Sequence, residues 1–444
     1  MSKLVSRLKL VFQFIFTSIG FFPTLISLLF FGLAVLIIYF ETRGISNYLK
    51  DDLPFFIITH GETANLILST IASGIFSLIV FSFTMVMLVL NQASSSFSPR
   101  VIPGLISSKS NQKVLGLYLG TLIYTLVVMV NIRSEQYDVD LPGLAVFLAM
   151  CFTIVCLAFF VYFIQSISAS IQIDNILESI YNTTLRKLNK EIELDEGKEL
   201  PAIFETGDWQ EIESIHTGYL QHVDRDPVIR LCQKHNVVIE FLQPLGHFVI
   251  KGLPFARISK PLKNRDEFCE ELDNHLNYYQ EELTDINYLY GFKQITESAV
   301  KALSPSINDP GTAIKAIDYL TDLFIFRMRL TDEKIYHDKE GTVRLRLDEV
   351  SFKELMSLCL GPVRVYGKAD PVILLRLLNL VKNLCYEVSD HPKYKDTLYD
   401  EASYILKDAD EAIKNLGDRS KINAMVKALN ATEALPRKLA LLAS

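Results

Sequence analysis

Four long apolar runs near the start of the chain constrain its fold more than any other feature. A helix needs roughly 20 apolar residues to cross the hydrocarbon core of a bilayer. The runs cover residues 21–40, 64–90, 114–130 and 144–164. No Asp, Glu, Lys, Arg or His interrupts any of them, which argues against a proton-coupled pump with a titratable relay inside the membrane. The sequence therefore predicts four transmembrane helices.

The remainder of the chain has the composition of an ordinary soluble domain. The mean hydropathy of all 444 residues is only +0.24, so a strongly apolar first third must be followed by a polar remainder. We expect an α+β protein: a four-helix transmembrane N-terminal region, then a mixed cytoplasmic domain with a small β-rich, barrel-like unit and a helical C-terminal part. The expected divisions are 1–165 (transmembrane), 166–200 (helical extension and linker), 201–260 (β-rich) and 261–444 (mainly helical).

Charge and cysteine usage exclude some classes of protein. The net charge of −7 gives no basic footprint, so nucleic acid is not expected as a partner. The six cysteines show no C-x-x-C spacing, which favours reduced, buried thiols over a disulfide framework.

Basic residues near the ends of the apolar runs predict the orientation. Lys and Arg gather on the cytoplasmic side of membrane proteins. Basic residues precede the first run, separate the second from the third and follow the fourth, whereas the other two loops are richer in Asp and Glu. The basic residues are Lys3, Arg7, Lys9, Arg100, Lys109, Lys113, Arg186, Lys187 and Lys190. Both termini are therefore expected inside a bacterial inner membrane, with the lipid bilayer as the first partner.

The second run differs from the others because hydroxyl and amide side chains recur along it at heptad-like spacing. Thr70, Ser73, Ser77, Thr84 and Asn91 fall on one helical face. Small hydroxyl residues in a membrane helix usually mark close helix packing. The alternative is a wet face that lines a pore in a homo-oligomer, where hydroxyls replace part of the hydration shell of an ion.

A short β-rich pattern follows the charged linker. Residues 217–223, 237–243, 247–250 and 254–258 have strand character, and residues 224–236 fit a helix. The glycine spacing from Gly246 resembles half of a biotinyl- or lipoyl-type barrel. No lysine stands in a carrier motif, so we expect no covalent cofactor.

The most distinctive soluble motif lies between two predicted helices. Asp309 is suited to cap the helix that begins at Pro310. A helix N-terminus surrounded by hydroxyl and amide groups suits a small anion, although polar groups that cap one another in a rigid connector explain the same residues. The candidate residues are Ser304, Ser306, Asn308, Asp309 and Thr312.

Catalytic motifs do not stand out in the sequence. It contains no P-loop, no H-E-x-x-H, no G-x-S-x-G and no histidine cluster at metal-ligand spacing. We therefore expect neither an enzyme nor a metal site.

Two long motifs carry a family resemblance. They are residues 91–100, which include the membrane-proximal Ser98, Pro99 and Arg100, and residues 303–310. With residues 112–116, 218–257 and 366–371, they resemble DUF2254, a family of bacterial predicted membrane proteins of unknown function. The resemblance implies a multi-pass inner-membrane protein and supplies no activity.

Three hypotheses of function follow. The first is an oligomer that forms or gates a permeation path, with the cytoplasmic domain as a sensor or assembly platform. The second is a membrane-anchored scaffold or signalling protein without a pore. The third, an enzyme that uses the Ser304–Thr312 loop, lacks a nucleophile–base pair.

Overall fold

The chain divides into two units. The computed structural model describes residues 20–43, 61–96, 109–132, 143–170, 172–194, 209–279, 284 and 287–443. One unit comprises residues 1–95 and 101–175, and the other comprises residues 96–100 and 176–444. Each unit is described by itself below.

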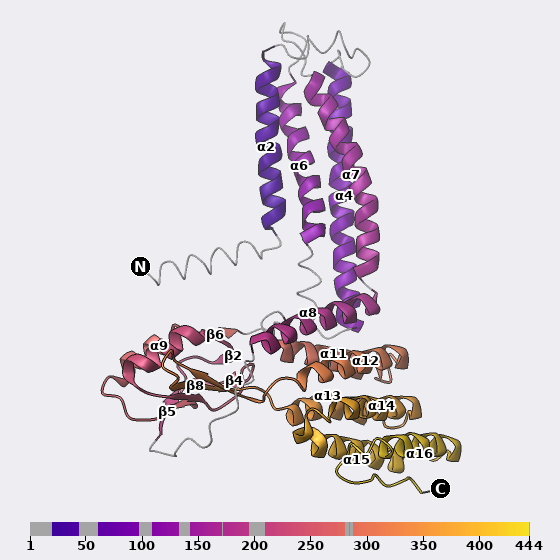
Figure 1. Ribbon diagram of the computed structural model, residues 1–444. Helices are drawn as coiled ribbons and strands as arrows, with labels where there is room; N and C mark the ends of the chain where they lie inside the picture. The colour runs from indigo at the N-terminus through magenta and orange to yellow at the C-terminus, as the bar shows by residue number, and fades with distance from the viewer. Residues whose placement is uncertain are drawn as a thin grey trace. The chain divides into compact units, whose positions relative to one another are not determined.

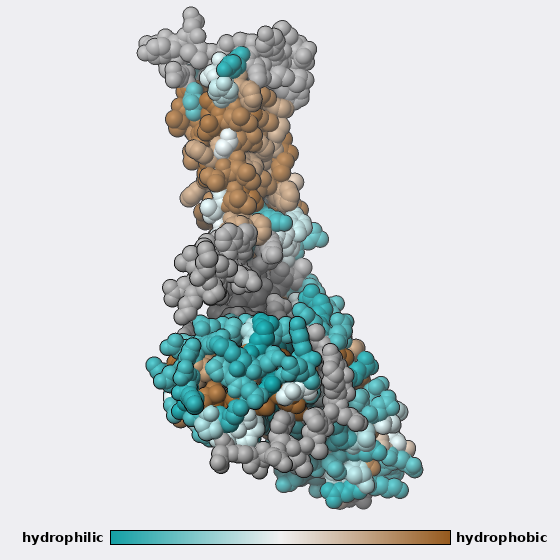
Figure 2. Space-filling model, turned by 60° about the vertical axis from the view of Figure 1, so that its left-hand side comes forward, coloured by the Kyte–Doolittle hydropathy of each residue, from teal (hydrophilic) through white to brown (hydrophobic). Residues whose placement is uncertain are grey.

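The first unit is built from four helices, which are labelled in Figure 1: α2 (Phe21–Glu41), α4 (Gly61–Ser96), α6 (Lys109–Asn131) and α7 (Gly143–Ser170). Within the described residues these four are long and apolar enough to cross a membrane, over Phe21–Glu41, Gly61–Asn91, Ser110–Asn131 and Gly143–Ser168. Their outer surface is largely hydrophobic (Figure 2). The four predicted spans are confirmed as helices, with ends that differ by a few residues.

Two glycines bring α6 close to α2. A Cβ atom on Gly120 would lie 2.8 Å from Cγ of Phe30, and one on Gly116 would lie 2.8 Å from Cδ1 of Ile26. The spacing G-x-x-x-G is a common way for membrane helices to approach closely, because van der Waals packing drives their association.

The polar side chains inside this unit come mainly from α6. Tyr118, Thr121, Tyr124 and Thr125 are buried, and the hydroxyl of Tyr124 donates to the carbonyl of Ala145 over 3.1 Å. The predicted hydroxyl stripe is on α4, yet most of the buried hydroxyls of this unit are on α6, and α4 contributes Ser82.

The second unit includes α8 (Ile173–Leu194) from Ile176 onward and continues into a β-rich part. Its elements are β1 (Gln210–Glu213), β2 (Gly218–Val223), α9 (Arg225–His235), β3 (Ile239–Phe241), β4 (Phe248–Val249), β5 (Pro254–Ile258), α10 (Arg265–Asp273) and β6 (Leu276–Tyr279). The predicted strands and helix between residues 217 and 258 correspond to β2, α9, β3, β4 and β5.

The strands form two open sheets rather than a barrel. One has the order β1-β5-β3-β8-β7, with β7 (Glu333–His337) and β8 (Val343–Asp348), and the other has the order β4-β2-β6. β8 runs parallel to β3, with Leu345 opposite Ile239. The barrel-like detail of the prediction is not confirmed, because neither sheet closes on itself. The sequence predicts a mainly helical part after residue 261, whereas β6, β7 and β8 from that part join these sheets.

The remaining helices stack as three pairs, visible as layers in Figure 1. They are α11 (Tyr288–Ala302) with α12 (Pro310–Arg327), α13 (Phe352–Gly367) with α14 (Pro371–Glu387), and α15 (Lys395–Ala412) with α16 (Leu416–Asn430). A short 3₁₀ helix, η2 (Pro392–Tyr394), precedes α15. α11 packs on α13 and α13 on α15, while α12 packs on α14 and α14 on α16. This is the packing of helical-repeat proteins, which expose long surfaces along the stack.

Candidate functional site

Helix α8 lies against the helical stack through one apolar face. Leu177, Ile180, Thr184 and Leu188 recur every three to four residues and are buried. Thr184 fills the space that a side chain on Gly291 of α11 would need, so only glycine fits at that point. The hydroxyl of Tyr181 donates to Asp322 of α12 over 2.6 Å. These contacts fix α8 along α11 and α12.

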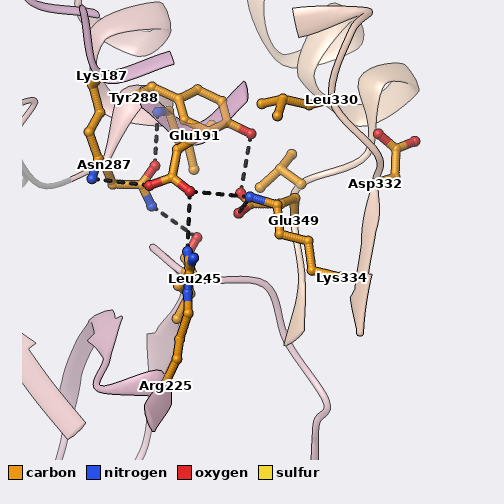
Figure 3. A network of polar contacts seen from close by, with 12 residues as sticks. Lys187, Glu191, Arg225, Leu245, Asn287, Tyr288, Leu330, Asp332, Lys334 and Glu349 are labelled. Atoms are coloured by element: carbon orange, nitrogen blue, oxygen red, sulfur yellow. Dashed lines mark hydrogen bonds and ion pairs between the residues drawn. The ribbon is translucent and has the colours of Figure 1, made fainter. Parts of the chain in front are cut away.

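The same face of α8 ends in a buried carboxylate. Glu191 is 7 % exposed and forms ion pairs with three cations, Lys187 at 3.1 Å, Arg225 at 3.2 Å and Lys334 at 3.3 Å (Figure 3). They come from α8 itself, from α9 and from β7. Glu191 thus connects α8 to α9 in the β-rich part and to the β7–β8 hairpin.

Each charge in this cluster has a counter-charge. Lys334, 6 % exposed, also pairs with Glu349 at 2.9 Å, and the hydroxyl of Tyr288 donates to Glu349 over 3.2 Å (Figure 3). Burial alone raises the pKa of Glu191, but the three cations outweigh it and lower that pKa to about 2. Burial alone lowers the pKa of Lys334, but Glu349 and Glu191 outweigh it and raise that pKa. Neither Glu191 nor Lys334 exchanges a proton near neutral pH, so the pair suits a structural joint better than acid–base catalysis.

Arg327 extends the joint into the helical stack. Its side chain is fully buried and pairs with Asp332 at 2.7 Å, while the same nitrogen donates to the carbonyl of Val350 over 2.7 Å. The backbone N–H of Phe352 donates to the same carboxylate of Asp332 over 3.2 Å. These contacts tie the end of α12 and the start of α13 to both ends of the β7–β8 hairpin.

A second feature of this unit is a groove of about 640 Å³ between α11 and α13. It is lined by Tyr219, Lys293, Thr296, Glu297, Val300, Lys301, Ser304, Leu358, Pro362 and Tyr366. The groove was not predicted from the sequence. Each wall has a local pattern, with charged residues spaced by four along α11 and apolar residues spaced by four along α13, but neither pattern shows that the two walls face each other.

The predicted stripe on α4 is exposed in the described part of the chain. Thr70, Ser73, Ser77, Thr84 and Asn91 lie on one face, away from the buried face that includes Leu68, Ile75 and Ser82. The hydroxyls of Thr70, Ser77 and Thr84 donate to carbonyls one turn earlier, at 2.7 to 2.9 Å. The structure therefore gathers the stripe on one surface and brings no other described element onto it.

The predicted anion loop is held together by its own polar groups. One carboxylate oxygen of Asp309 accepts from the N–H of Thr312 over 3.2 Å, and the other accepts from its hydroxyl over 2.6 Å. Ser304 donates to the carbonyl of Lys301, and its hydroxyl lies 3.2 Å from that of Ser306. Asn308 has φ +49° in the turn. Of these residues only Ser304 lines the groove, and anion binding by the loop stays a prediction.

Two other expectations bear on sites. Ser98, Pro99 and Arg100 lie outside the described residues. Among the described residues, no group of three or more His, Cys, Asp or Glu side chains is placed to hold a metal ion.

Comparison with known proteins places the chain in a family. The family described as "Predicted membrane protein (DUF2254)" matches residues 17–383. An uncharacterized protein of Mycobacterium bovis, Mb1321c, is 25% identical over 390 residues, which cover 85% of this chain and 74% of the relative. An uncharacterized protein of Mycobacterium tuberculosis, Rv1290c, matches with the same identity and coverage. No solved structure matches the chain. Because the family match covers most of the sequence, this protein is a member of the DUF2254 family of predicted membrane proteins.

Proposed function

We propose that this protein is a homo-oligomer in the bacterial inner membrane in which α4 of each copy faces a shared permeation path. The observation that carries the proposal is the exposure of Thr70, Ser73, Ser77 and Thr84 on a span whose opposite face already packs inside the protomer. A second face of small polar residues, which no element among the described residues covers, suits contact with other copies around an axis.

The hydroxyl geometry favours water or a cation over an anion in that path. Thr70, Ser77 and Thr84 direct their hydrogens to backbone carbonyls, so the oxygen lone pairs remain for a partner outside the helix. Lone pairs accept from water and coordinate cations. Replacing part of a hydration shell in this way needs no fixed charge in the membrane.

The second unit is proposed to act as a sensor or assembly platform on the cytoplasmic side. α8 begins at Ile173, three residues after the end of α7 at Ser170. Its far end is held by the Glu191 joint. A rearrangement of the second unit would therefore move α8. The chain connects α8 directly to α7, the fourth span.

Cysteine labelling tests the path. In the full-length protein with its native cysteines replaced, cysteines at positions 70, 73, 77 and 84 are expected to react with small water-soluble thiol reagents. Matched cysteines at Phe76 and Phe83, which are also exposed but lie off the stripe, should react at least tenfold more slowly.

Ser77→Leu separates the path from a dry packing seam. In a path it narrows and dries the lumen while the oligomer stays intact. In a seam it pushes helices apart and the oligomer dissociates. If all four stripe cysteines are protected from the thiol reagents and the Ser77→Leu oligomer dissociates, the path is excluded. The alternative hypothesis, a membrane-anchored scaffold or signalling protein without a pore, then remains.

A further inference from the structure

We infer that the groove between α11 and α13 binds a small amphipathic anion, a molecule with a phosphate or carboxylate group on an aromatic or aliphatic body. The inference gives the proposed sensor a ligand class. Binding itself does not depend on whether α4 lines a path, so the two proposals fail separately.

Opposite walls of the groove differ in character. On α11, Lys293, Glu297 and Lys301 are spaced by four residues and therefore share a face. On α13, Leu358, Pro362 and Tyr366 are also spaced by four, and Leu358 and Tyr366 are 43 % and 53 % exposed. One wall is thus charged and the other apolar. At about 640 Å³, the groove falls within the usual size range of small-molecule sites.

Charge on the α11 wall favours an anion. Two ammonium groups, on Lys293 and Lys301, flank the single carboxylate of Glu297, so the wall carries a net positive charge. A solvated helix face commonly shows such alternation. Here, however, all three side chains are half-buried and line a hollow opposite apolar side chains instead of facing open water.

Thr296 and Ser304 add hydroxyl-bearing side chains to the lining of the same wall. Thr296 is 5 % exposed, and its hydroxyl lies beside the thiol of Cys359. Thr296 lines the groove between Lys293 and Lys301 in the sequence, next to the cationic groups that an anion needs.

Two aromatic residues give the groove an apolar surface that the aromatic or aliphatic part of the ligand can contact. Tyr219 of β2 and Tyr366 of α13 both line the groove, and the ring of Tyr219 packs edge-on against Phe248 at 5.2 Å. The packed ring offers a surface that is already ordered before a ligand arrives. An ordered aromatic surface favours an apolar body because little side-chain entropy is lost on binding.

Ligand titration tests the assignment. The probes are phenyl phosphate and phenylacetate, added to the full-length protein in lipid nanodiscs and followed by calorimetry. Inorganic phosphate supplies the charge without the ring, and phenol supplies the ring without the charge. At least one of the two amphipathic anions should bind saturably, and at least tenfold more tightly than either fragment.

Substitutions locate the binding. Lys301→Gln removes one cation and Leu358→Asp adds a negative charge on the apolar wall, so each should weaken binding at least tenfold. Lys427→Gln, on exposed α16, removes the same charge elsewhere and should leave binding unchanged. Melting temperatures of all variants check that the fold is kept. Absence of saturable binding of both probes, or equal affinity in the folded Leu358→Asp, Lys301→Gln and wild-type proteins, overturns the inference.

Discussion

Glu191 shows how much of the second unit depends on one side chain. Its carboxylate pairs with Lys187, Arg225 and Lys334, and Lys334 is buried at least as deeply as Glu191. Removal of one member of a buried ion pair is far more costly than loss of an exposed pair, because an uncompensated charge stays behind.

Glu191→Gln is therefore expected to lower the free energy of unfolding of the second unit by about 3 kcal/mol. Glutamine keeps the size of the side chain and removes its charge. Chemical denaturation of the full-length protein in detergent measures the change. Glu193→Gln, two residues away on the exposed face of α8, is the matched control and should change stability by less than about 0.5 kcal/mol. Equal behaviour of the two variants contradicts the role of Glu191.

The same carboxylate predicts an acid dependence. The pKa of Glu191 is lowered from 4.5 to about 2 in the folded protein, so its stabilising contribution is complete above pH 4.5 and is lost as the pH falls toward 2. The stability advantage of wild type over Glu191→Gln should accordingly shrink between about pH 5 and pH 2. Denaturation of both proteins at pH 7 and pH 3 measures the difference, and a constant difference rejects the assignment.

Asp309 gives a local prediction in the predicted loop. Its carboxylate accepts from the N–H of Thr312 and so caps α12. Asp309→Ala should cost about 1 kcal/mol of stability, whereas Asp309→Asn keeps an acceptor and should cost only a few tenths. Thermal unfolding of both variants provides the measurement. Identical melting temperatures for Ala and Asn speak against the cap.

These two residues differ in what the sequence can reveal. The cap joins residues three positions apart, so Asp309 was identified from its neighbours alone. Glu191 and Lys334 are 143 positions apart. Their pairing depends on the packing of α8 beside the β7–β8 hairpin, and no local pattern contains that information. The groove was not predicted for the same reason, because its walls belong to separate helices.

Close packing of α6 on α2 predicts different effects of alanine at two glycines. A Cβ on Gly120 meets the ring of Phe30, whereas a Cβ on Gly32 of α2 meets nothing within 4 Å. Gly120→Ala should lower stability by about 1–3 kcal/mol through overpacking. Gly32→Ala should leave it unchanged or raise it slightly. Unfolding in mixed detergent micelles compares the two, and equal losses contradict the packing.

Elements with a strong local signal were predicted well. Apolar length identified all four spans, and β-branched runs between turn residues identified β2 to β5. The β7–β8 hairpin was missed because helical patterns surround it. Its signal was present in the alternation of Val343 to Asp348 and in Gly341, which takes φ +80° in the turn. The three-pair stack was not predicted, because helix order alone does not determine which helices pack.

For the whole molecule, the distribution of Lys and Arg predicts that both termini are cytoplasmic. Reporter fusions after Lys50 and after Tyr137 should report the outside of the cell, and fusions after Ser108 and after Lys190 should report the inside. Alkaline phosphatase and a fluorescent protein serve as complementary reporters. A cytoplasmic signal from the fusion at Lys50 is incompatible with four spans in this orientation.

The insertion of β8 beside β3 has a consequence for biosynthesis. Ile239 pairs with Leu345, so the ribosome adds about 100 residues after β3 before its parallel neighbour exists. Because synthesis proceeds at about 5–20 residues per second, the edge of β3 that pairs with β8 stays unpaired for about 5–20 s. An unpaired strand edge is prone to aggregation during that interval. We therefore expect a nascent chain that is released before β8 has been made to depend on chaperones, while the completed chain does not.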